Sequence, residues 1–244
     1  MTTSRRSWLR AALGVAAAFS SRVIAQDRYA AARENLLREI ESEMRATAHE
    51  TGHPALGAAV RRALASVPRE RFVPTLMAEL AYENRPLPIG EGQTISQPFI
   101  VALMTELLQP KPDHVVLEVG TGSGYQAAVL AQCVAKVYSI EIVASLGRRA
   151  RETLDAAGYC NVETRIGDGY LGWPEAAPFD GIIVTAAPDH VPPRLIEQLK
   201  PGGRLVIPVG PHRALQQLLV IESARDGGAV TRRTIAVRFV PLTR

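Results

Sequence analysis

The stretch Glu118-Val-Gly-Thr-Gly-Ser-Gly124 decides the fold of this chain. An apolar run at residues 115–117 precedes it and predicts a strand, and an apolar run at residues 125–131 follows it and predicts a helix. A strand, a glycine-rich turn and a helix in this order form a nucleotide-cofactor site at the edge of a parallel sheet. The glycines let the backbone turn sharply and approach a ligand that a Cβ atom would block.

The spacing of the glycines narrows the choice of cofactor. Gly120, Gly122 and Gly124 read G-x-G-x-G, whereas the dinucleotide fingerprint is G-x-G-x-x-G. The pattern therefore points away from an NAD oxidoreductase and towards S-adenosylmethionine (SAM). A serine hydrolase is not indicated either, because Ser123 does not stand in a G-x-S-x-G elbow.

From residue 115 onward, predicted strands alternate with predicted helices. We expect strands at 115–119, 136–141, 161–167, 180–185 and 204–209, and helices near 124–134, 143–157 and 192–199. Lys200-Pro-Gly-Gly-Arg204 predicts a reverse turn, and Asp226-Gly-Gly228 predicts a hairpin turn between two further strands at 216–221 and 234–240. We therefore predict an α/β fold of the class I SAM-dependent methyltransferase type (Rossmann-like), with a mostly parallel seven-stranded sheet.

The segment before this core predicts a helical cap. Helices are expected at 28–49, 56–65 and 98–108, a short irregular segment at 69–80, and an ordered Gly- and Pro-rich loop at 87–98. Ser96 is expected to cap the helix at 98–108, which has a proline in its first turn. The predicted organisation is a leader at 1–25, a helical cap with a substrate loop at 26–112, and a SAM-binding core at 113–244.

The first 25 residues resemble a twin-arginine export signal. Ser4-Arg-Arg-Ser-Trp-Leu-Arg10 is followed by an apolar segment too short to span a bilayer, and then by small residues that suggest cleavage before Gln26. We expect a periplasmic protein without a stable membrane anchor; the alternatives are a cytoplasmic protein, a misassigned start and a disordered basic tail. The leader carries the whole formal charge of +4, so nucleic acid is not an expected partner.

Acids at the ends of three predicted strands converge on one crevice, because the carboxyl ends of parallel strands share an edge of the sheet. Glu118 suits a free amino group such as that of SAM, Glu141 suits the ribose hydroxyls, and Asp168 suits the adenine amino group beside Gly169. Each acid alone could be a solvated residue at a strand end.

The remaining metal-ligating residue types give no such constellation. Cys133 and Cys160 are expected to be buried thiols rather than a disulfide. His49 and His53 have helical spacing, but Gly52 and Pro54 interrupt the helix there. No metal site is predicted.

Several segments together resemble the protein-L-isoaspartate O-methyltransferase family. They are Val67-Pro-Arg-Glu-Arg-Phe-Val73, Leu87-Pro-Ile-Gly-Glu-Gly-Gln-Thr-Ile-Ser-Gln-Pro98, Leu117-Glu-Val-Gly-Thr-Gly-Ser-Gly-Tyr125, Gly167-Asp-Gly169, Phe179-Asp-Gly-Ile-Ile-Val-Thr-Ala-Ala187 and Val237-Arg-Phe-Val-Pro-Leu242. The match runs in order from about residue 30 to the C-terminus. Two features depart from the pattern: Asn84 stands where the family often has an acid, and the export signal is atypical.

The resemblance implies a repair enzyme. Such an enzyme transfers a methyl group from SAM to the α-carboxylate of L-isoaspartyl residues in damaged proteins and peptides, and the ester then cyclises spontaneously to a succinimide. Ser96 would be the catalytic residue, and a monomer is expected. The implied substrate contacts are Thr94, Ile95, Gln97, Val237 and Arg238.

The chemistry agrees with the lack of an obvious general base. A carboxylate nucleophile is already ionised at neutral pH, because its reference pKa is about 3.5–4. The hydroxyl of Ser96 can donate a hydrogen bond to it, although a purely structural role for Ser96 stays open. The alternatives are a SAM enzyme acting on RNA, on a small molecule or on another protein carboxylate, and a SAM-binding module without catalysis.

Overall fold

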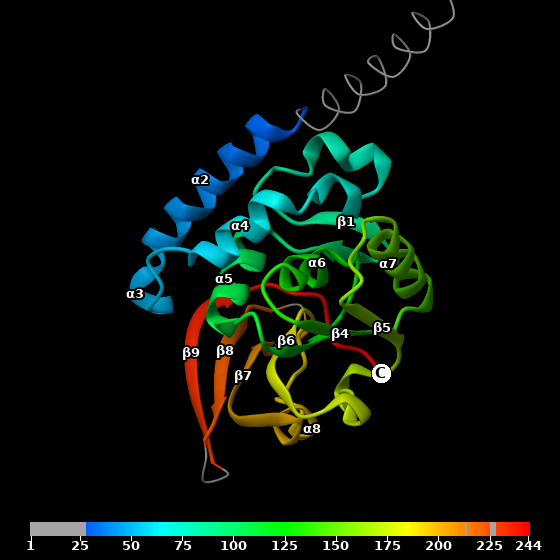
Figure 1. Cartoon of the computed structure of the whole chain (residues 1–244). Helices are drawn as coiled ribbons and strands as arrows, with labels where there is room; N and C mark the ends of the chain where they lie inside the picture. The colour runs from blue at the N-terminus through cyan, green and yellow to red at the C-terminus, as the bar shows by residue number, and fades with distance from the viewer. Residues whose placement is uncertain (1–27, 213, 225–227) are drawn as a thin grey trace, which may run out of the picture.

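The computed structural model describes residues 28–212, 214–224 and 228–244, and a seven-stranded sheet forms its centre (Figure 1). The strands, in the spatial order β5-β4-β3-β6-β7-β8-β9, are β5 (Val162–Ile166), β4 (Lys136–Glu141), β3 (Val115–Val119), β6 (Phe179–Val184), β7 (Leu199–Val209), β8 (Gln216–Ser223) and β9 (Ala229–Val237). The pairs from β5 to β7 are parallel, whereas β8 pairs antiparallel with β7 and β9. The predicted fold class is confirmed.

The order of the strands positions the site. The chain runs from β3 outward through β4 and β5, and then returns to place β6 on the other side of β3. Connections therefore leave the carboxyl ends of β3 and β6 in opposite directions, and such a reversal opens a ligand crevice at that edge of the sheet. The glycine turn that follows β3 lies at this point.

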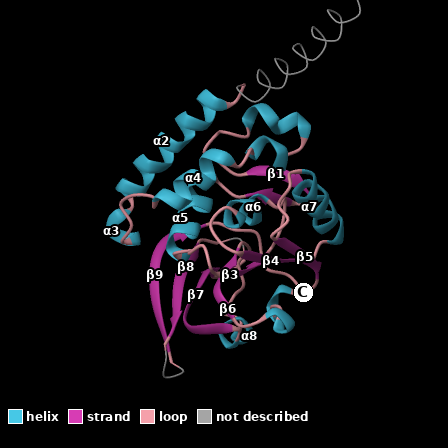
Figure 2. Ribbon diagram, in the orientation of Figure 1, coloured by secondary structure: helices cyan, strands magenta, loops and turns pink. Residues whose placement is uncertain are grey.

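Helices cover both faces of the sheet (Figure 2). The α-helices are α2 (Ala30–Ala46), α3 (Ala48–Thr51), α4 (Ala58–Ser66), α5 (Pro98–Leu108), α6 (Tyr125–Ala131), α7 (Ala144–Ala156) and α8 (Pro193–Glu197). Four short 3-10 helices are η1 (Arg69–Phe72), η2 (Thr75–Leu80), η3 (Gly169–Leu171) and η4 (Pro174–Ala176), and a small antiparallel hairpin joins β1 (Leu87–Gly90) to β2 (Gln93–Ile95).

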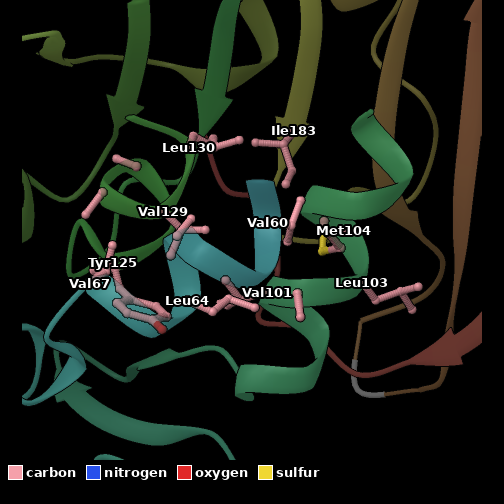
Figure 3. Close-up of a cluster of buried hydrophobic side chains, with 14 of the residues drawn as sticks. Val60, Leu64, Val67, Val101, Leu103, Met104, Tyr125, Val129, Leu130 and Ile183 are labelled. Carbon is pink, nitrogen blue, oxygen red and sulfur yellow. The ribbon is translucent and has the colours of Figure 1, made fainter. Parts of the chain in front are cut away.

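Alternate strand residues point to opposite faces and feed two buried clusters. Val116 and Ile183 belong to the larger cluster, whereas Leu117 and Ile182 belong to the smaller one. Figure 3 shows part of the larger cluster, in which side chains of α4, α5 and α6 pack together and Ile183 lies at one edge. Because α5 packs on β6 and β7 as well as on α2 and α4, the N-terminal cap shares its core with the sheet.

Sequence patterns located most elements but not all their limits. The helix expected at 28–49 ends at Ala46, and α3 is a separate turn that ends at Gly52, whose φ is +74°. β7 starts at Leu199, so the expected reverse turn at 200–204 lies within that strand. The β1–β2 hairpin occupies most of the segment expected to be a loop. Of the predicted hairpin turn, Asp226 and Gly227 lie outside the described residues, as does the predicted leader at 1–25.

The two cysteines are both free, as expected, but only Cys133 is buried. Burial raises the pKa of the Cys133 thiol to about 11. Cys160 is exposed because it lies in the turn between α7 and β5, so the expectation that it is buried was wrong.

Asp180 joins three neighbouring strands through one carboxylate oxygen. Its Oδ2 accepts hydrogen bonds from the backbone N–H of Val115 in β3 and from Nζ of Lys200 in β7, both at 2.8 Å. Burial alone would raise the pKa of Asp180, but the bonds from Lys200 and Val115 outweigh it and hold the pKa below its ordinary value. The ionised form therefore stabilises the fold.

We expect Asp180→Asn to lower the free energy of unfolding by about 1–3 kcal/mol at pH 7, since it weakens hydrogen bonds to a charged group. A group with a depressed folded pKa contributes fully above its unfolded pKa, about 3.9, and loses that contribution as the pH falls through the folded value. The difference from the wild type should therefore shrink below about pH 4. Urea denaturation at pH 7 and pH 3 measures it. The control is Asp155→Asn, which removes a surface pair with Arg151; an equal loss in both variants would contradict the assignment.

Candidate active site

The glycine turn after β3 is held in place from both neighbouring strands. The N–H of Gly120 donates to the carbonyl of Ile140 in β4 at 2.8 Å, and Oγ1 of Thr185, just after β6, donates to the carbonyl of Gly120 at 2.6 Å. Gly120 has φ +97°, and a Cβ there would lie 2.4 Å from Oγ1 of Thr185. Only glycine therefore fits at this position without displacing a neighbouring strand.

A hollow that we call the inner crevice lies beside this turn. Predicted site residues that line it are Thr94, Ile95, Ser96, Glu118, Gly120, Gly122, Glu141 and Gly169. Thr94 and Ile95 belong to β2, Ser96 follows it, and the others come from the ends of three parallel strands. Of the three acids expected to converge here, Glu118 and Glu141 line the crevice. Gly124 does not line this space: a Cβ there would meet Leu154 of α7 at 3.3 Å.

A second hollow, the outer groove, lies between the cap and the end of β9. The predicted residues Gln97, Val237 and Arg238 line it and do not line the inner crevice. Thr94 and Ser96 line both spaces, and so do Thr185 and Val240. The two hollows therefore meet at Ser96, with the inner crevice on one side of this residue and the outer groove on the other.

Ser96 does not cap α5. The N-cap is Gln97, whose own side chain makes no capping hydrogen bond. Instead, the N–H of Phe99 in the first turn donates to Oδ1 of Asn84 at 3.0 Å, while Nδ2 of Asn84 donates to Oε2 of Glu43 at 2.8 Å. The Ser96 hydroxyl makes no hydrogen bond to the part of the chain that the structure describes, which leaves it available to a ligand.

Glu118 is fully buried, with 0% of its surface exposed. The hydroxyl of Ser139 donates to Oε2 of Glu118, but Oε1 has no partner among the described residues. Burial raises the pKa of Glu118 to about 8; the Ser139 bond opposes this effect and the nearby Glu141 adds to it. A buried carboxyl with an unpaired oxygen at the wall of a crevice is suited to a cationic or hydrogen-bond-donating ligand.

Glu141 holds the glycine turn against the start of α7. Its Oε2 accepts from the N–H of Gly122 at 2.7 Å, and its Oε1 accepts from the N–H of Val143 at 2.9 Å. A carboxylate offers about four lone-pair sites, so both oxygens keep capacity for a ligand in the crevice.

Asp168 is not among the residues that line the inner crevice. Its Oδ1 accepts from the N–H of Tyr170 at 2.9 Å and thereby caps η3. The neighbouring Gly169 does line the crevice, and a Cβ at Gly169 would lie 2.4 Å from Cγ1 of Val119. A role for the remaining oxygen of Asp168 stays a prediction.

Sequence reasoning missed two parts of the site. Thr185 lines both hollows, and its place at the end of the strand predicted at 180–185 is the same signal that located Glu118 and Glu141. The C-terminal segment was expected to contact substrate only, but residues 240–243 also line the inner crevice. Backbone bonds fix that segment: the N–H of Ala187 donates to Val240 at 2.8 Å, and the N–H of Leu242 donates to Ala187 at 2.9 Å.

Among the described residues, no group of three or more His, Cys, Asp and Glu side chains is arranged to hold a metal ion. The site therefore offers backbone amides, hydroxyls and carboxylates as its polar groups. These groups can bind an adenosyl moiety and an amino group, and can orient an anion.

The family model and similar curated proteins all name one family. The family model described as protein-L-isoaspartate(D-aspartate) O-methyltransferase (PCMT) matches residues 44–244. Protein-L-isoaspartate O-methyltransferase 2 of Syntrophobacter fumaroxidans is 56% identical over 219 residues, which cover 90% of this chain and 89% of that protein. Protein-L-isoaspartate O-methyltransferase 2 of a Polaromonas species is 57% identical over 208 residues, which cover 85% of this chain and 99% of that protein.

Solved structures have a similar fold. A protein-L-isoaspartate O-methyltransferase superposes with a TM-score of 0.75 at 29% identity, covering 87% of this chain and 66% of that one. A Plasmodium falciparum protein described as a putative member of the same family, in complex with S-adenosyl-L-homocysteine, gives a TM-score of 0.71 at 24% identity and shares the fold.

Proposed function

The chain belongs to the protein-L-isoaspartate(D-aspartate) O-methyltransferase family, and we propose that its inner crevice holds SAM while its outer groove presents the isoaspartyl carboxylate. The protein is a SAM-dependent protein carboxyl methyltransferase that acts on L-isoaspartyl residues. The observation that carries the proposed division is that Thr94 and Ser96 line both spaces. A methyl group at the inner side of Ser96 and a carboxylate at its outer side would face each other there.

Each cofactor contact follows from the chemistry of the group in the crevice. The unpaired Oε1 of Glu118 would accept from the amino group of SAM. Glu141 would accept from the ribose hydroxyls with the lone pairs that Gly122 and Val143 leave free. Gly120 and Gly122 give the backbone room to approach the ligand.

The substrate carboxylate would meet donors at the other side. The Ser96 hydroxyl is free, and the first turn of α5 contributes Gln97, Phe99 and Ile100 to the outer groove. Pro98 has no N–H and that of Phe99 donates to Asn84, so α5 favours an anion here through the partial positive charge of its N-terminus. Arg238 adds a positive charge at the exposed wall of the groove.

The reaction requires alignment more than proton transfer. One bond forms between a carboxylate oxygen and the methyl carbon while the bond from that carbon to sulfur breaks, and the sulfonium charge and the carboxylate charge cancel. No proton moves, so no general base is needed. Since water stabilises the separated charges more than the neutral products, a crevice closed to water and in-line positioning should supply most of the acceleration.

We also propose that the protein is exported to the periplasm by the twin-arginine route. The support is the sequence of residues 1–25, which lie outside the described residues. In the part of the chain that the structure describes, no helix is long and apolar enough to cross a membrane. Fractionation of the host, with N-terminal sequencing to find whether the mature chain starts at Gln26, distinguishes export from a cytoplasmic location.

The assignment of the two spaces predicts that one variant loses turnover and another loses affinity for SAM. With an isoaspartyl peptide and its aspartyl twin as substrates, the wild type should methylate only the former. Ser96→Ala should lower the turnover number roughly ten- to a hundredfold, because a hydrogen bond to a charged group is lost, while the Kd for SAM stays nearly constant. Glu141→Ala should instead raise the Kd for SAM by a similar factor. Equal loss of both quantities in Ser96→Ala would reject its place at the methyl group.

The raised pKa of Glu118 predicts that SAM binding releases a proton. The free protein holds Glu118 mostly neutral at pH 7, and a bound ammonium favours the ionised form, so affinity should rise with pH by up to about tenfold per unit between pH 6 and 7. Calorimetry in buffers of different ionisation enthalpy measures the released proton. Glu118→Gln is the control and should show a smaller pH dependence; identical wild-type enthalpies in all buffers would disprove the contact.

A further inference from the structure

Arg69 is a fully buried cation in η1, with 0% of its surface exposed. A charge taken out of water is normally compensated by an opposite charge. Yet no described carboxylate forms an ion pair with Arg69. Burial lowers the pKa of Arg69 to about 10, so the guanidinium remains positive at neutral pH.

Backbone carbonyls and an aromatic ring surround this guanidinium. Its Nε donates to the carbonyl of Ala81 and its Nη2 donates to the carbonyl of Ser96, both at 2.8 Å. Its Cζ lies 4.8 Å from the centroid of the Tyr125 ring. Nη1 has no hydrogen-bond partner among the described residues.

Two of these three partners belong to the active site. Ser96 lies where the inner crevice meets the outer groove, and Tyr125 lines the inner crevice at the start of α6. Arg69 thus connects the segment that carries the free hydroxyl to the helix that follows the glycine turn. The planar guanidinium fixes the direction of two N–H donors at once, which a flexible ammonium group does not.

Stability alone is a poor reason for this residue. Replacing buried charges by apolar side chains of similar volume is often neutral or stabilising in proteins. The geometry points to another role: we propose that Arg69 is a positioning residue for methyl transfer, which holds the carbonyl of Ser96 and so sets the Ser96 hydroxyl at the junction of the two spaces. This inference rests on the proposed division between the inner crevice and the outer groove.

The test compares Arg69→Met and Arg69→Lys with the wild type. Three quantities are measured: kcat/KM for an isoaspartyl peptide, the Kd for SAM by calorimetry, and the midpoint of thermal unfolding. In Arg69→Met, kcat/KM should fall roughly ten- to a hundredfold, as expected for the loss of hydrogen bonds from a charged donor, while the Kd for SAM changes less than about threefold. Arg69→Lys keeps the charge without the planar donor set and should stay at least about tenfold impaired.

Two further variants separate positioning from general damage. Leu64→Ala removes a buried side chain of α4 that lines neither space. It is the control for any loss of stability in Arg69→Met. Arg71→Met removes an exposed arginine of the same η1 helix. Both should keep kcat/KM near the wild-type value in the folded fraction.

The outcomes are distinct. Parallel losses of SAM affinity and kcat/KM in Arg69→Met, or the same loss of kcat/KM in the Leu64→Ala control, would show that Arg69 acts only through the fold. Full activity in Arg69→Lys would show that charge, and not geometry, is what the site needs. Failure of the wild type itself to methylate the isoaspartyl peptide would overturn the proposed function instead.

Discussion

The close approach of Gly120 to Thr185 is the constraint on which the rest of the structure depends. Two parallel strands, β3 and β6, end side by side, and the turn after β3 must pass between the carbonyl of Ile140 and the hydroxyl of Thr185. A residue without Cβ at Gly120 allows this passage, and the passage brings backbone amides to the edge of the sheet. The crevice, the buried carboxylates beside it and the start of α6 all take their positions from this turn.

Buried polar groups give the site its character. Glu118 and Arg69 are both fully removed from solvent, and neither has an opposite charge within reach in the described structure. Glu118 lines the inner crevice from the sheet, whereas Arg69 lies in the cap and contacts the crevice residues Ser96 and Tyr125. Such groups are costly to bury, so one at the crevice and one bonded to its lining residues indicate a site arranged around charged reactants.

The sequence predicted the parts of this site that follow from strand ends. β3, β4 and α5 have the expected limits, and Glu118, Glu141, Gly120 and Gly122 meet because parallel strands terminate at one edge. Predictions that depended on which way a residue in a turn faces were less accurate. Gly124 faces α7, and one oxygen of Asp168 accepts from the backbone N–H of Tyr170. The β1–β2 pairing and the contact of Arg69 with Ser96 join segments whose proximity only tertiary packing determines, so local pattern does not reveal them.

The segment that follows β9 forms part of the wall of the inner crevice. Residues 240–243 line it, and Cζ of the neighbouring Arg244 lies 4.5 Å from the centroid of the Tyr170 ring. Backbone hydrogen bonds to Ala187 thereby build this segment into the wall of a binding space. A small fluorophore placed on this segment would therefore sense whether the space behind it is occupied.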